Sequence, residues 1–240
     1  MRVLITRAVP DAEQFAALCR DQGLTPIISP VMEIDIQSRA VDLSDIDALA
    51  FTSANGVRAF VHNSDRRDLL VFAVGPVTGK VAREAGFQHV REAGGDVHRL
   101  RDHIVSERTS FSQTLLHVAG MDRAGDLVQL LKHENISARR ETLYAANAVS
   151  TLSDDVIAQL RADPPVEWAT FFSPRTAALF LELAAKAGVS EELKKMRAAC
   201  LSDAVAARAG SANWHALHVA PDYSATSLLQ MILHSNAGSA

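Results

Sequence analysis

The feature that most restricts the fold of this chain is an internal repeat. Residues 3–33 align without a gap on residues 115–145, at a constant offset of 112 positions. The alignment places Leu18 opposite Leu130, and Gly23 opposite Asn135. Gly and Asn are the residues that best tolerate the left-handed conformation that ends a helix. We interpret the repeat as a duplicated strand-helix-strand segment. The alternative interpretation is that the match reflects only the general similarity between any two strand-helix units of an α/β protein, without duplication.

Two shorter matches extend the repeat. Residues 50–56 correspond to residues 170–176 at an offset of 120, and residues 73–78 correspond to residues 200–205 at an offset of 127. Each copy then has five strands in ~100–120 residues, which is the size of a five-stranded doubly wound domain. The repeat therefore favours two similar domains over a single sheet of ten strands.

Strand-like and helix-like segments alternate along most of the chain. The helix-like stretches have apolar residues at every third or fourth position, as an amphipathic helix requires. Such alternation predicts parallel sheets covered by helices on both faces, the α/β class. The clearest helix-like stretches are Asp11–Gln22, Thr78–Ala85, Asp122–His133 and Thr176–Ala187. The strand-like runs are Val3–Thr6, Pro26–Val31, Ala48–Thr52, Val71–Val74, His89–Glu92, Leu115–Val118, Thr142–Ala146, Ala169–Phe172, Ala198–Leu201 and Ala216–Val219.

Two extended segments, residues 30–39 and residues 139–150, carry no helix signal and are longer than an average strand. Two long crossings would arise if the chain left the first domain after its second strand and returned after completing the second domain. Two domains in sequence would need only one crossing. The residues alone leave both arrangements open.

Charge and cysteine content exclude several classes of function. The formal net charge is −4, so the chain has no basic field that could hold a nucleic-acid backbone. Cys19 and Cys200 lie in apolar runs and are expected to be structural thiols in a reducing compartment. The N-terminal segment is too short and too polar for a signal peptide, and no apolar run approaches the ~20 residues that span a bilayer. We therefore expect a cytoplasmic protein that does not enter a membrane.

The sequence has no clear motif for a cofactor or a metal. Residues 75–81 resemble a phosphate loop, but only three residues separate the glycines, and Val81 stands where a Ser or Thr would bind magnesium. The nine histidines form no set with metal-ligand spacing. We expect neither a metal nor an organic cofactor. An enzyme with this sequence would have to work by positioning and by backbone dipoles.

Three turns place hydroxyl or glycine residues between a strand and a helix-like run: Thr52–Gly56, Gly75–Gly79 and Ser173–Thr176. In parallel α/β sheets, ligands bind beyond the carboxyl ends of the strands, where helix N-termini direct their N–H groups outward. Each turn could serve only as a helix cap, which typically contributes ~1 kcal/mol. Three such turns in a pair of domains favour an anion-binding cleft.

The order and spacing of these segments resemble the uroporphyrinogen-III synthase family. The matching segments are Val-Leu-Ile-Thr-Arg at residues 3–7, Ala-Phe-Thr-Ser-Ala-Asn-Gly-Val at 50–57, Ala-Val-Gly-Pro-Val-Thr at 73–78, Leu-Tyr at 143–144 and Phe-Phe-Ser-Pro-Arg-Thr at 171–176. Each motif is short, but the resemblance covers nearly the whole chain, from Val3 to about Leu233.

The resemblance implies two similar, doubly wound, parallel five-stranded α/β domains joined by a two-stranded β connector. The first domain would comprise residues 1–33 and 150–240, the second residues 38–146, and the connectors residues 34–37 and 147–149. The implied substrate is hydroxymethylbilane, a linear tetrapyrrole with eight carboxylates. Family members close it into uroporphyrinogen III, with loss of water and inversion of ring D, in haem biosynthesis. They use no cofactor, and we expect this chain to be a monomer.

By matched position, the resemblance also implies site residues. Tyr144 would hydrogen-bond the departing hydroxyl group and assist its loss, and Thr78 would bind a substrate side chain. Ser202 and Val205 depart from the family pattern, because many members have Gly and Thr at these positions. The other substrate-binding candidates, which would line the carboxylate sites, are Gly75, Thr52, Ser53, Asn55, Gly56, Ser173, Arg175, Thr176 and Arg7.

A function from another class is also open, namely a non-catalytic two-domain module that binds a small anion. Hinged pairs of α/β domains often do no more than this. Such modules are commonly exported, and the absence of an export signal counts against this alternative.

Overall fold

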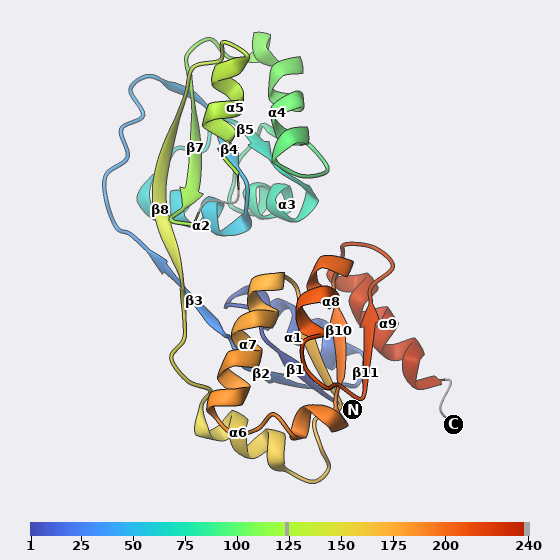
Figure 1. The fold of residues 1–240 in the computed structure, drawn as a ribbon. Helices are drawn as coiled ribbons and strands as arrows, with labels where there is room; N and C mark the ends of the chain where they lie inside the picture. Colours follow the sequence, from blue (N-terminus) through green and yellow to red (C-terminus); the bar gives the residue numbers. More distant parts are fainter. Residues whose placement is uncertain (123–124, 238–240) are drawn as a thin grey trace. The chain divides into compact units, whose positions relative to one another are not determined.

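The computed structural model describes residues 1–122 and 125–237, which form two compact units. The first unit comprises Met1–Glu33 and Asn147–Ala240, and the second comprises Ile34–Ala146. The chain leaves the first unit after Glu33 and returns to it at Asn147, so that its N-terminal and C-terminal segments belong to the same unit (Figure 1). Of the two arrangements that the sequence leaves open, the structure has the nested one. Residues 34–37, expected as a connector, group with the second unit, and residues 147–149 group with the first.

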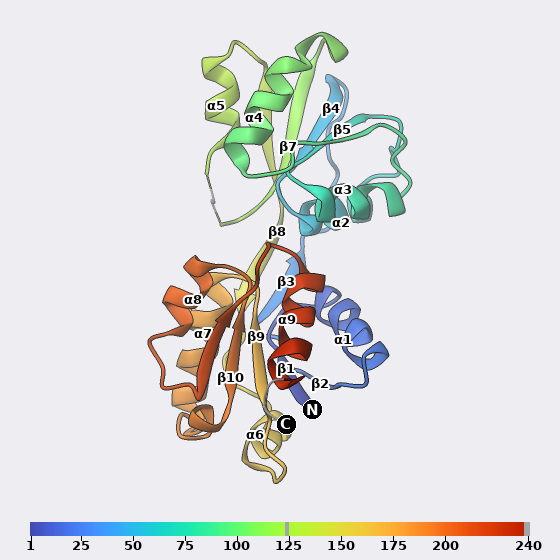
Figure 2. The same cartoon turned by 90° about the vertical axis from the view of Figure 1, so that its right-hand side faces the viewer.

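The first unit is built on a parallel sheet with the strand order β11-β10-β9-β1-β2. Helices α7 and α8 lie on one face of this sheet, and α1 and α9 lie on the other (Figure 2). Its strands are β1 (Arg2–Ile5), β2 (Thr25–Ile28), β9 (Trp168–Phe171), β10 (Arg197–Cys200) and β11 (Ala216–Val219). Its helices are α1 (Asp11–Asp21), α6 (Asp154–Arg161), α7 (Pro174–Lys186), α8 (Asp203–Ala209) and α9 (Ala225–Ala237).

The strands of this sheet are apolar on both faces because both faces are covered. Successive side chains of a strand point to opposite sides. Leu4 accordingly packs in the core under α7 with Phe180, whereas Val3 and Ile5 pack in the other core with Phe15 of α1. All five side chains are at most 1% exposed. The continuous apolar runs in the sequence therefore reflect burial on two faces, as expected for parallel strands.

The second unit has the strand order β3-β8-β7-β4-β5-β6. Helices α2 and α3 pack on one face with Leu49 and Phe51, and α4 and α5 pack on the other with Ala48 and Ala50 (Figure 2). The strands are β3 (Met32–Ile36), β4 (Ile46–Phe51), β5 (Leu70–Ala73), β6 (Val90–Glu92), β7 (Thr114–Gly120) and β8 (Ala138–Ala148). The helices are α2 (Ala54–Asn63), α3 (Pro76–Glu84), α4 (Val97–Ser106) and α5 (Leu127–His133).

The predicted connector forms part of this second sheet. Strand β3 is its sixth, edge strand and pairs with β8, so the sheet has one strand more than predicted. The N–H of Val149 donates to the carbonyl oxygen of Val31, and the N–H of Gln37 donates to the carbonyl oxygen of Leu143. A later residue near β3 thus pairs with an earlier residue of β8. Strand β3 therefore runs antiparallel to β8. The remaining strand pairs of both sheets are parallel, which confirms the predicted α/β class.

The internal repeat corresponds to equivalent positions in the two sheets. Read from its other edge, the first sheet has the order β2-β1-β9-β10-β11, and without its edge strand β3 the second sheet has the order β8-β7-β4-β5-β6. Strands at the same place in these two orders correspond. The offset of 127 carries Leu70–Ala73 of β5 onto Arg197–Cys200 of β10, which is the whole strand. The sequence matches thus relate strands that occupy the same place in each sheet.

One predicted helix begins later than its periodicity indicates. The sequence predicts a helix from Asp122 to His133, but α5 begins at Leu127 because the Asp126 carboxylate caps it by accepting a hydrogen bond from the N–H of Gln129 over 3.1 Å. Asp122 lies in a bend. Residues 123 and 124 of the predicted helix are outside the described residues.

The two cysteines are free thiols inside the first unit. Burial raises the pKa of Cys19 to about 11 and the pKa of Cys200 to about 12. Both thiols are therefore protonated near neutral pH, as expected of structural cysteines. Within residues 1–122 and 125–237, no helix has both the length and the apolar character needed to cross a membrane.

Candidate functional site

The turn between β4 and α2 places two hydroxyl groups at the carboxyl end of β4. Thr52 and Ser53 directly follow Phe51, the last residue of the strand. Ser53 is the N-cap of α2, and its Oγ accepts a hydrogen bond from the N–H of Gly56 over 3.3 Å. A serine here satisfies one of the N–H groups that the first helical turn leaves without an intrahelical partner. Helix capping therefore sets the position of the Ser53 hydroxyl.

Gly56 allows α2 to lie close to the sheet. A Cβ at this position would be 2.9 Å from the carbonyl oxygen of Val118 in β7, too close for a non-bonded contact. The glycine therefore lets the first turn of α2, including Ser53, approach the end of β7. The sequence predicts Gly56 as a residue that lines the site; in the structure it lies in the contact between α2 and β7.

Tyr144 reaches the Ser53 hydroxyl from β8. The pairing of β7 with β8 shifts register near its end, so that Ala119 pairs with Thr142 and Gly120 pairs with Tyr144. The phenol ring lies against Gly120, where an added Cβ would be 2.8 Å from two ring carbons. The Tyr144 hydroxyl is 2.7 Å from Oγ of Ser53. The glycine and the register shift together place the phenol beside the start of α2.

A histidine from the middle of β7 forms another wall of the same region. The register of β4 and β7 pairs Ala50 with His117, and Nε2 of the imidazole is 3.2 Å from Oγ1 of Thr52. His117 is only 5% exposed. Burial lowers the pKa of His117 to about 4; the charge of Arg140 also lowers this pKa, and Asp126 opposes the shift. The ring is therefore neutral near pH 7.

These side chains line a polar cavity of about 210 Å³ in the second unit. The cavity lies where β4, β5 and β7 end, the edge at which parallel α/β sheets bind ligands. Hydroxyl groups, a guanidinium, an imidazole and a carboxylate face it together with small apolar residues. The lining residues are Thr52, Ser53, Val74, Val97, His117, Ala119, Gly120, Asp122, Gly125, Arg140 and Tyr144.

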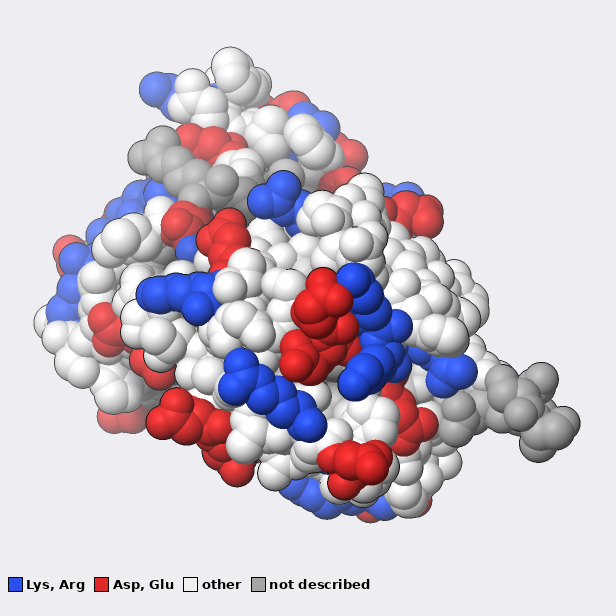
Figure 3. Space-filling model, turned by 60° about the horizontal axis from the view of Figure 1, so that its bottom comes forward, with Lys and Arg blue, Asp and Glu red and all other residues white. Residues whose placement is uncertain are grey.

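The cavity contains the groups that an anion requires. Arg140 contributes a positive charge, and its guanidinium is held by a hydrogen bond to the carbonyl oxygen of Gly120. Thr52 and Tyr144 contribute hydroxyls. On the face of the molecule shown in Figure 3, Lys and Arg side chains are interspersed with Asp and Glu, so this face presents no extended basic surface. The formal net charge of the chain is −4, so binding of a polyanion would depend on individual donors rather than on a long-range field.

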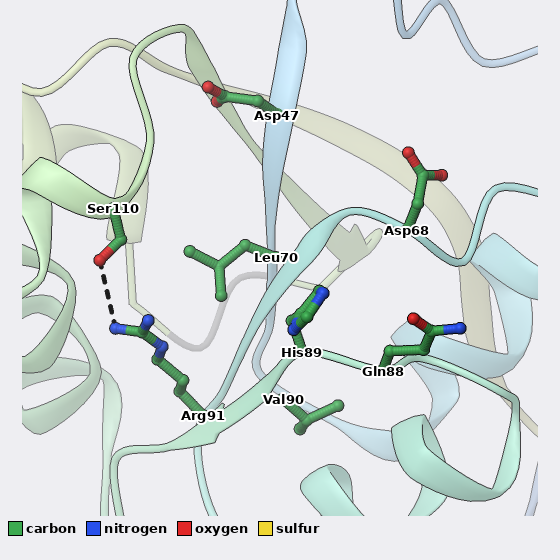
Figure 4. A pocket seen from close by; sticks show the side chains of 8 residues that line it. All are labelled: Asp47, Asp68, Leu70, Gln88, His89, Val90, Arg91 and Ser110. Carbon is green, nitrogen blue, oxygen red and sulfur yellow. Dashed lines mark hydrogen bonds between the residues drawn. The ribbon is translucent and has the colours of Figure 1, made fainter.

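A larger cavity of about 460 Å³ lies at the opposite, amino end of the same sheet (Figure 4). Several of its polar groups are already engaged: Arg91 bonds Ser110 over 3.3 Å and pairs with Glu107, and one carboxylate oxygen of Asp47 accepts from the N–H of Ser112. The other oxygen of Asp47 is buried without a hydrogen-bond partner among residues 1–122 and 125–237. This edge also lacks the helix N-termini that follow the strands. We therefore place the candidate site at the carboxyl edge.

The structure brings Thr52, Ser53 and Tyr144 together, and other predicted residues of the second unit lie outside this lining. Gly75 is the N-cap of α3, and Thr78, which is 5% exposed, lies in the first turn of that helix. Asn55 accepts a hydrogen bond from Arg58 over 2.7 Å.

The remaining predicted residues belong to the first unit. Ser173 and Thr176 form a capping box at the start of α7, with each side chain accepting from the other residue's N–H, and Arg175 is exposed beside them. Arg7 forms an ion pair with Asp11 over 2.8 Å, and its guanidinium lies 4.2 Å from the centre of the Phe172 ring. In the same unit, Ser202 caps α8 by accepting from the N–H of Val205 over 3.4 Å.

Sequence reasoning missed His117, Gly120 and Arg140. His117 interrupts an otherwise apolar run, Leu115–Ala119, and this was the one signal that pointed to it. An isolated polar residue in a buried strand needs a partner. For Gly120 and Arg140, the placement depends on the pairing of β7 with β8, which the residues themselves do not reveal. No group of three or more His, Cys, Asp or Glu side chains suited to a metal occurs among the residues that the structure describes.

Fold and site together define a two-domain α/β protein with two largely parallel sheets and a polar cavity at the carboxyl edge of one of them. The model of the uroporphyrinogen-III synthase HemD family matches residues 13–230. The chain belongs to the uroporphyrinogen-III synthase family, as its sequence motifs predict. The activity of this family is that of a hydro-lyase in tetrapyrrole biosynthesis.

Individual relatives agree with this assignment. A putative uroporphyrinogen-III synthase of Methanocaldococcus jannaschii is 43% identical over 58 residues, a match that spans 24% of each chain. The crystal structure of uroporphyrinogen-III synthetase from Helicobacter pylori has a TM-score of 0.67 at 17% identity and covers 98% of this chain and 100% of its own. A mutant uroporphyrinogen III synthase from Thermus thermophilus has a TM-score of 0.52 at 16% identity, with 100% of each chain covered. The two structures share the fold and confirm the predicted fold class.

The buried, neutral His117 should make the protein less stable in acid. In the unfolded chain the imidazole returns to a pKa of 6.5, so between pH 6.5 and about pH 4 the unfolded state binds a proton that the folded state does not. The free energy of unfolding should therefore be highest above pH 6.5. On account of this residue it should fall by about 2 kcal/mol between pH 7 and about pH 4.5.

Urea unfolding, followed by circular dichroism at both pH values, checks this expectation. His117→Gln, which cannot titrate, should show a smaller loss of stability than the wild type. His89→Gln, at an exposed position, is the control for the substitution itself. An equal loss of stability in the wild type and in His117→Gln would contradict the expectation.

Proposed function

We propose that this chain acts as a uroporphyrinogen-III synthase and closes hydroxymethylbilane into uroporphyrinogen III. The reaction removes water from the hydroxymethyl group of ring A and inverts ring D through a spiro intermediate. Membership of the family supports the reaction. The observation that carries the assignment of a site is the hydrogen bond between the Tyr144 hydroxyl and Ser53 in a polar cavity at the carboxyl edge of the sheet.

In this proposal, Tyr144 assists the departure of the hydroxyl group. The Ser53 oxygen already accepts from the N–H of Gly56, so the Ser53 proton is available for the Tyr144 oxygen. When Ser53 is the donor in this hydrogen bond, the phenol proton is free to point into the cavity. As the C–O bond breaks, the leaving oxygen gains negative charge and accepts a hydrogen bond from the phenol, and it departs as water after taking up a proton. Assistance of this kind typically contributes ~10²–10⁴-fold.

The carboxylates of the substrate need several binding groups, because the chain has a net negative charge. In the cavity, Arg140 supplies a charge and Thr52 a hydroxyl. A guanidinium and a neutral hydroxyl are both good donors to a carboxylate. The Gly120 carbonyl that accepts from Arg140 orients the guanidinium. These groups would bind one substrate carboxylate beside Tyr144.

Helix N-termini would bind the other carboxylates, since their N–H groups and their dipole favour anions. Helix α3 has Gly75 as its N-cap and Thr78 in its first turn. Helix α2 has Asn55 and Gly56 in its first turn. In the first unit, α7 offers the same arrangement with Ser173, Arg175 and Thr176. Arg7 is the weakest candidate because Asp11 neutralises it.

Conversion of hydroxymethylbilane by the purified protein tests the proposal. With a chelator present and no added cofactor, the monomer should produce the type III isomer, which is identified by chromatography after oxidation of the product to the porphyrin. We propose that this reaction takes place in the cytoplasm, where two free cysteines remain reduced.

The isomer that forms decides between enzyme and binding module. Unassisted closure of the linear tetrapyrrole yields the type I isomer. Formation of the type I isomer alone would overturn the assignment as an enzyme. If the protein nevertheless bound the tetrapyrrole, it would be a non-catalytic anion-binding module.

A further inference from the structure

His117 is a buried polar side chain whose hydrogen bonding is incomplete. Its Nε2 is 3.2 Å from Oγ1 of Thr52, whereas Nδ1 is buried and has no hydrogen-bond partner within residues 1–122 and 125–237. The neighbouring residues of β7, Leu116 and Val118, are apolar and fully packed. A buried imidazole costs stability unless it is bonded. Packing alone therefore does not explain a histidine at this position.

The surroundings of the ring select one of its two neutral forms. A neutral imidazole carries one proton, on either Nδ1 or Nε2. A proton on Nδ1 would leave a buried N–H without an acceptor, and such groups are rare. A proton on Nε2 gives that N–H an acceptor in Oγ1 of Thr52 and leaves a lone pair on Nδ1. The positive charge of Arg140, which acts on this ring, favours the lone pair and disfavours a second proton.

The Nε2–H form determines the direction of the Thr52 hydroxyl. When Oγ1 accepts the imidazole proton, its own O–H cannot point back toward the ring. Thr52 and His117 both line the cavity that also contains Arg140 and Tyr144. The threonine proton is then available to a ligand in that cavity.

We propose that His117 is a positioning residue that holds the Thr52 hydroxyl as a hydrogen-bond donor toward a carboxylate of the substrate. The inference rests on the proposed function, because it concerns the same cavity and the same polycarboxylate. It adds that recognition of this carboxylate requires the neutral histidine behind Thr52. In this proposal, His117 acts through the Thr52 hydroxyl and not through a hydrogen bond of its own to the substrate.

Two substitutions of similar size separate the hydrogen bond from packing. Methionine and glutamine are both unbranched and nearly equal in length, but only glutamine can donate to Thr52. His117→Met should raise KM about tenfold, with kcat within about threefold of the wild type, since a lost ground-state contact raises KM alone. His117→Gln should recover most of this loss.

A double substitution tests whether His117 acts through Thr52. Thr52→Val should raise KM by a similar factor, and Thr52→Val combined with His117→Met should be no worse than Thr52→Val alone. If the factors by which the two substitutions raise KM multiplied in the double variant, His117 would act independently of Thr52 and the proposal would be overturned. So would equal KM values for His117→Met and the wild type.

A measurement without substrate addresses the proton on the ring. In nitrogen NMR of protein labelled in its histidines, the ring signals that disappear in His117→Gln belong to His117. These signals should show a neutral ring protonated on Nε2 at pH 7, and they should shift in Thr52→Val. A proton on Nδ1 would overturn the inference. The NMR result does not depend on the reaction. If the wild type formed only the type I isomer, the proposed function would fail. If the wild type formed the type III isomer and His117→Met had the same KM as the wild type, only the role of His117 would fail.

Discussion

Replacement of Tyr144 by phenylalanine should lower kcat by a factor of about 100 or more. The substitution removes only the hydroxyl that lies 2.7 Å from Ser53, and the ring can keep its place against Gly120. If the phenol assists the departure of the hydroxyl group, its loss affects the transition state more than the bound substrate. The measurement is steady-state turnover of hydroxymethylbilane, together with product affinity and the melting temperature, both of which should change little.

The second tyrosine of the chain provides a matched control. Tyr223 is 80% exposed, and Tyr223→Phe removes the same atom at the surface of the first unit. This control should turn over like the wild type. If Tyr144→Phe keeps more than about a third of wild-type turnover, the tyrosine is not the assisting group. A lower melting temperature with turnover intact would instead identify Tyr144 as a structural residue.

Substitution of Gly120 by alanine should lower kcat by about 100-fold although it adds only one methyl group. The new Cβ would lie 2.8 Å from two carbons of the Tyr144 ring and 3.1 Å from its oxygen. The ring must move, and the hydroxyl then leaves its position beside Ser53. A displacement of about 1 Å in an active site can reduce the rate of reaction by about 100-fold. The loss should appear in steady-state kinetics, with a folded protein by circular dichroism.

A double variant shows whether Gly120 acts through Tyr144. Once the hydroxyl has been removed, its displacement should have no further effect. Gly120→Ala combined with Tyr144→Phe should therefore be about as active as Tyr144→Phe alone. If the losses of kcat multiplied in the double variant, Gly120 would act by another route than Tyr144, for example through its carbonyl group, which accepts a hydrogen bond from Arg140.

Much of the fold follows from local patterns in the sequence. The apolar runs and the three-to-four residue periodicity depend on which faces of each element are buried, and these patterns are present in the chain itself. The offset of 127 relates strands β5 and β10 over their full length because duplicated segments keep their internal spacing. The start of α5 was less predictable, since the Asp126 cap shortens it relative to its apolar periodicity.

The candidate site was only partly predictable. Thr52 and Ser53 were identified because a hydroxyl residue between a strand and a helix is a recognisable cap, and Tyr144 was identified by its resemblance to family members. His117 and Gly120 were not, because their importance depends on what lies beside them. Histidine in a strand predicts nothing about its partner, and a terminal glycine predicts nothing about an aromatic ring against it.

The sequence alone specified the types of the elements, their order and the repetition of the unit, because burial and capping act within a few residues. The tertiary structure decided which strands are neighbours. Strand β7 pairs with β4 and β8, and this brings His117 to Thr52 and Gly120 to Tyr144. These pairs are 65 and 24 positions apart, and they meet because the backbone hydrogen bonds between strands set a register that neither segment carries by itself.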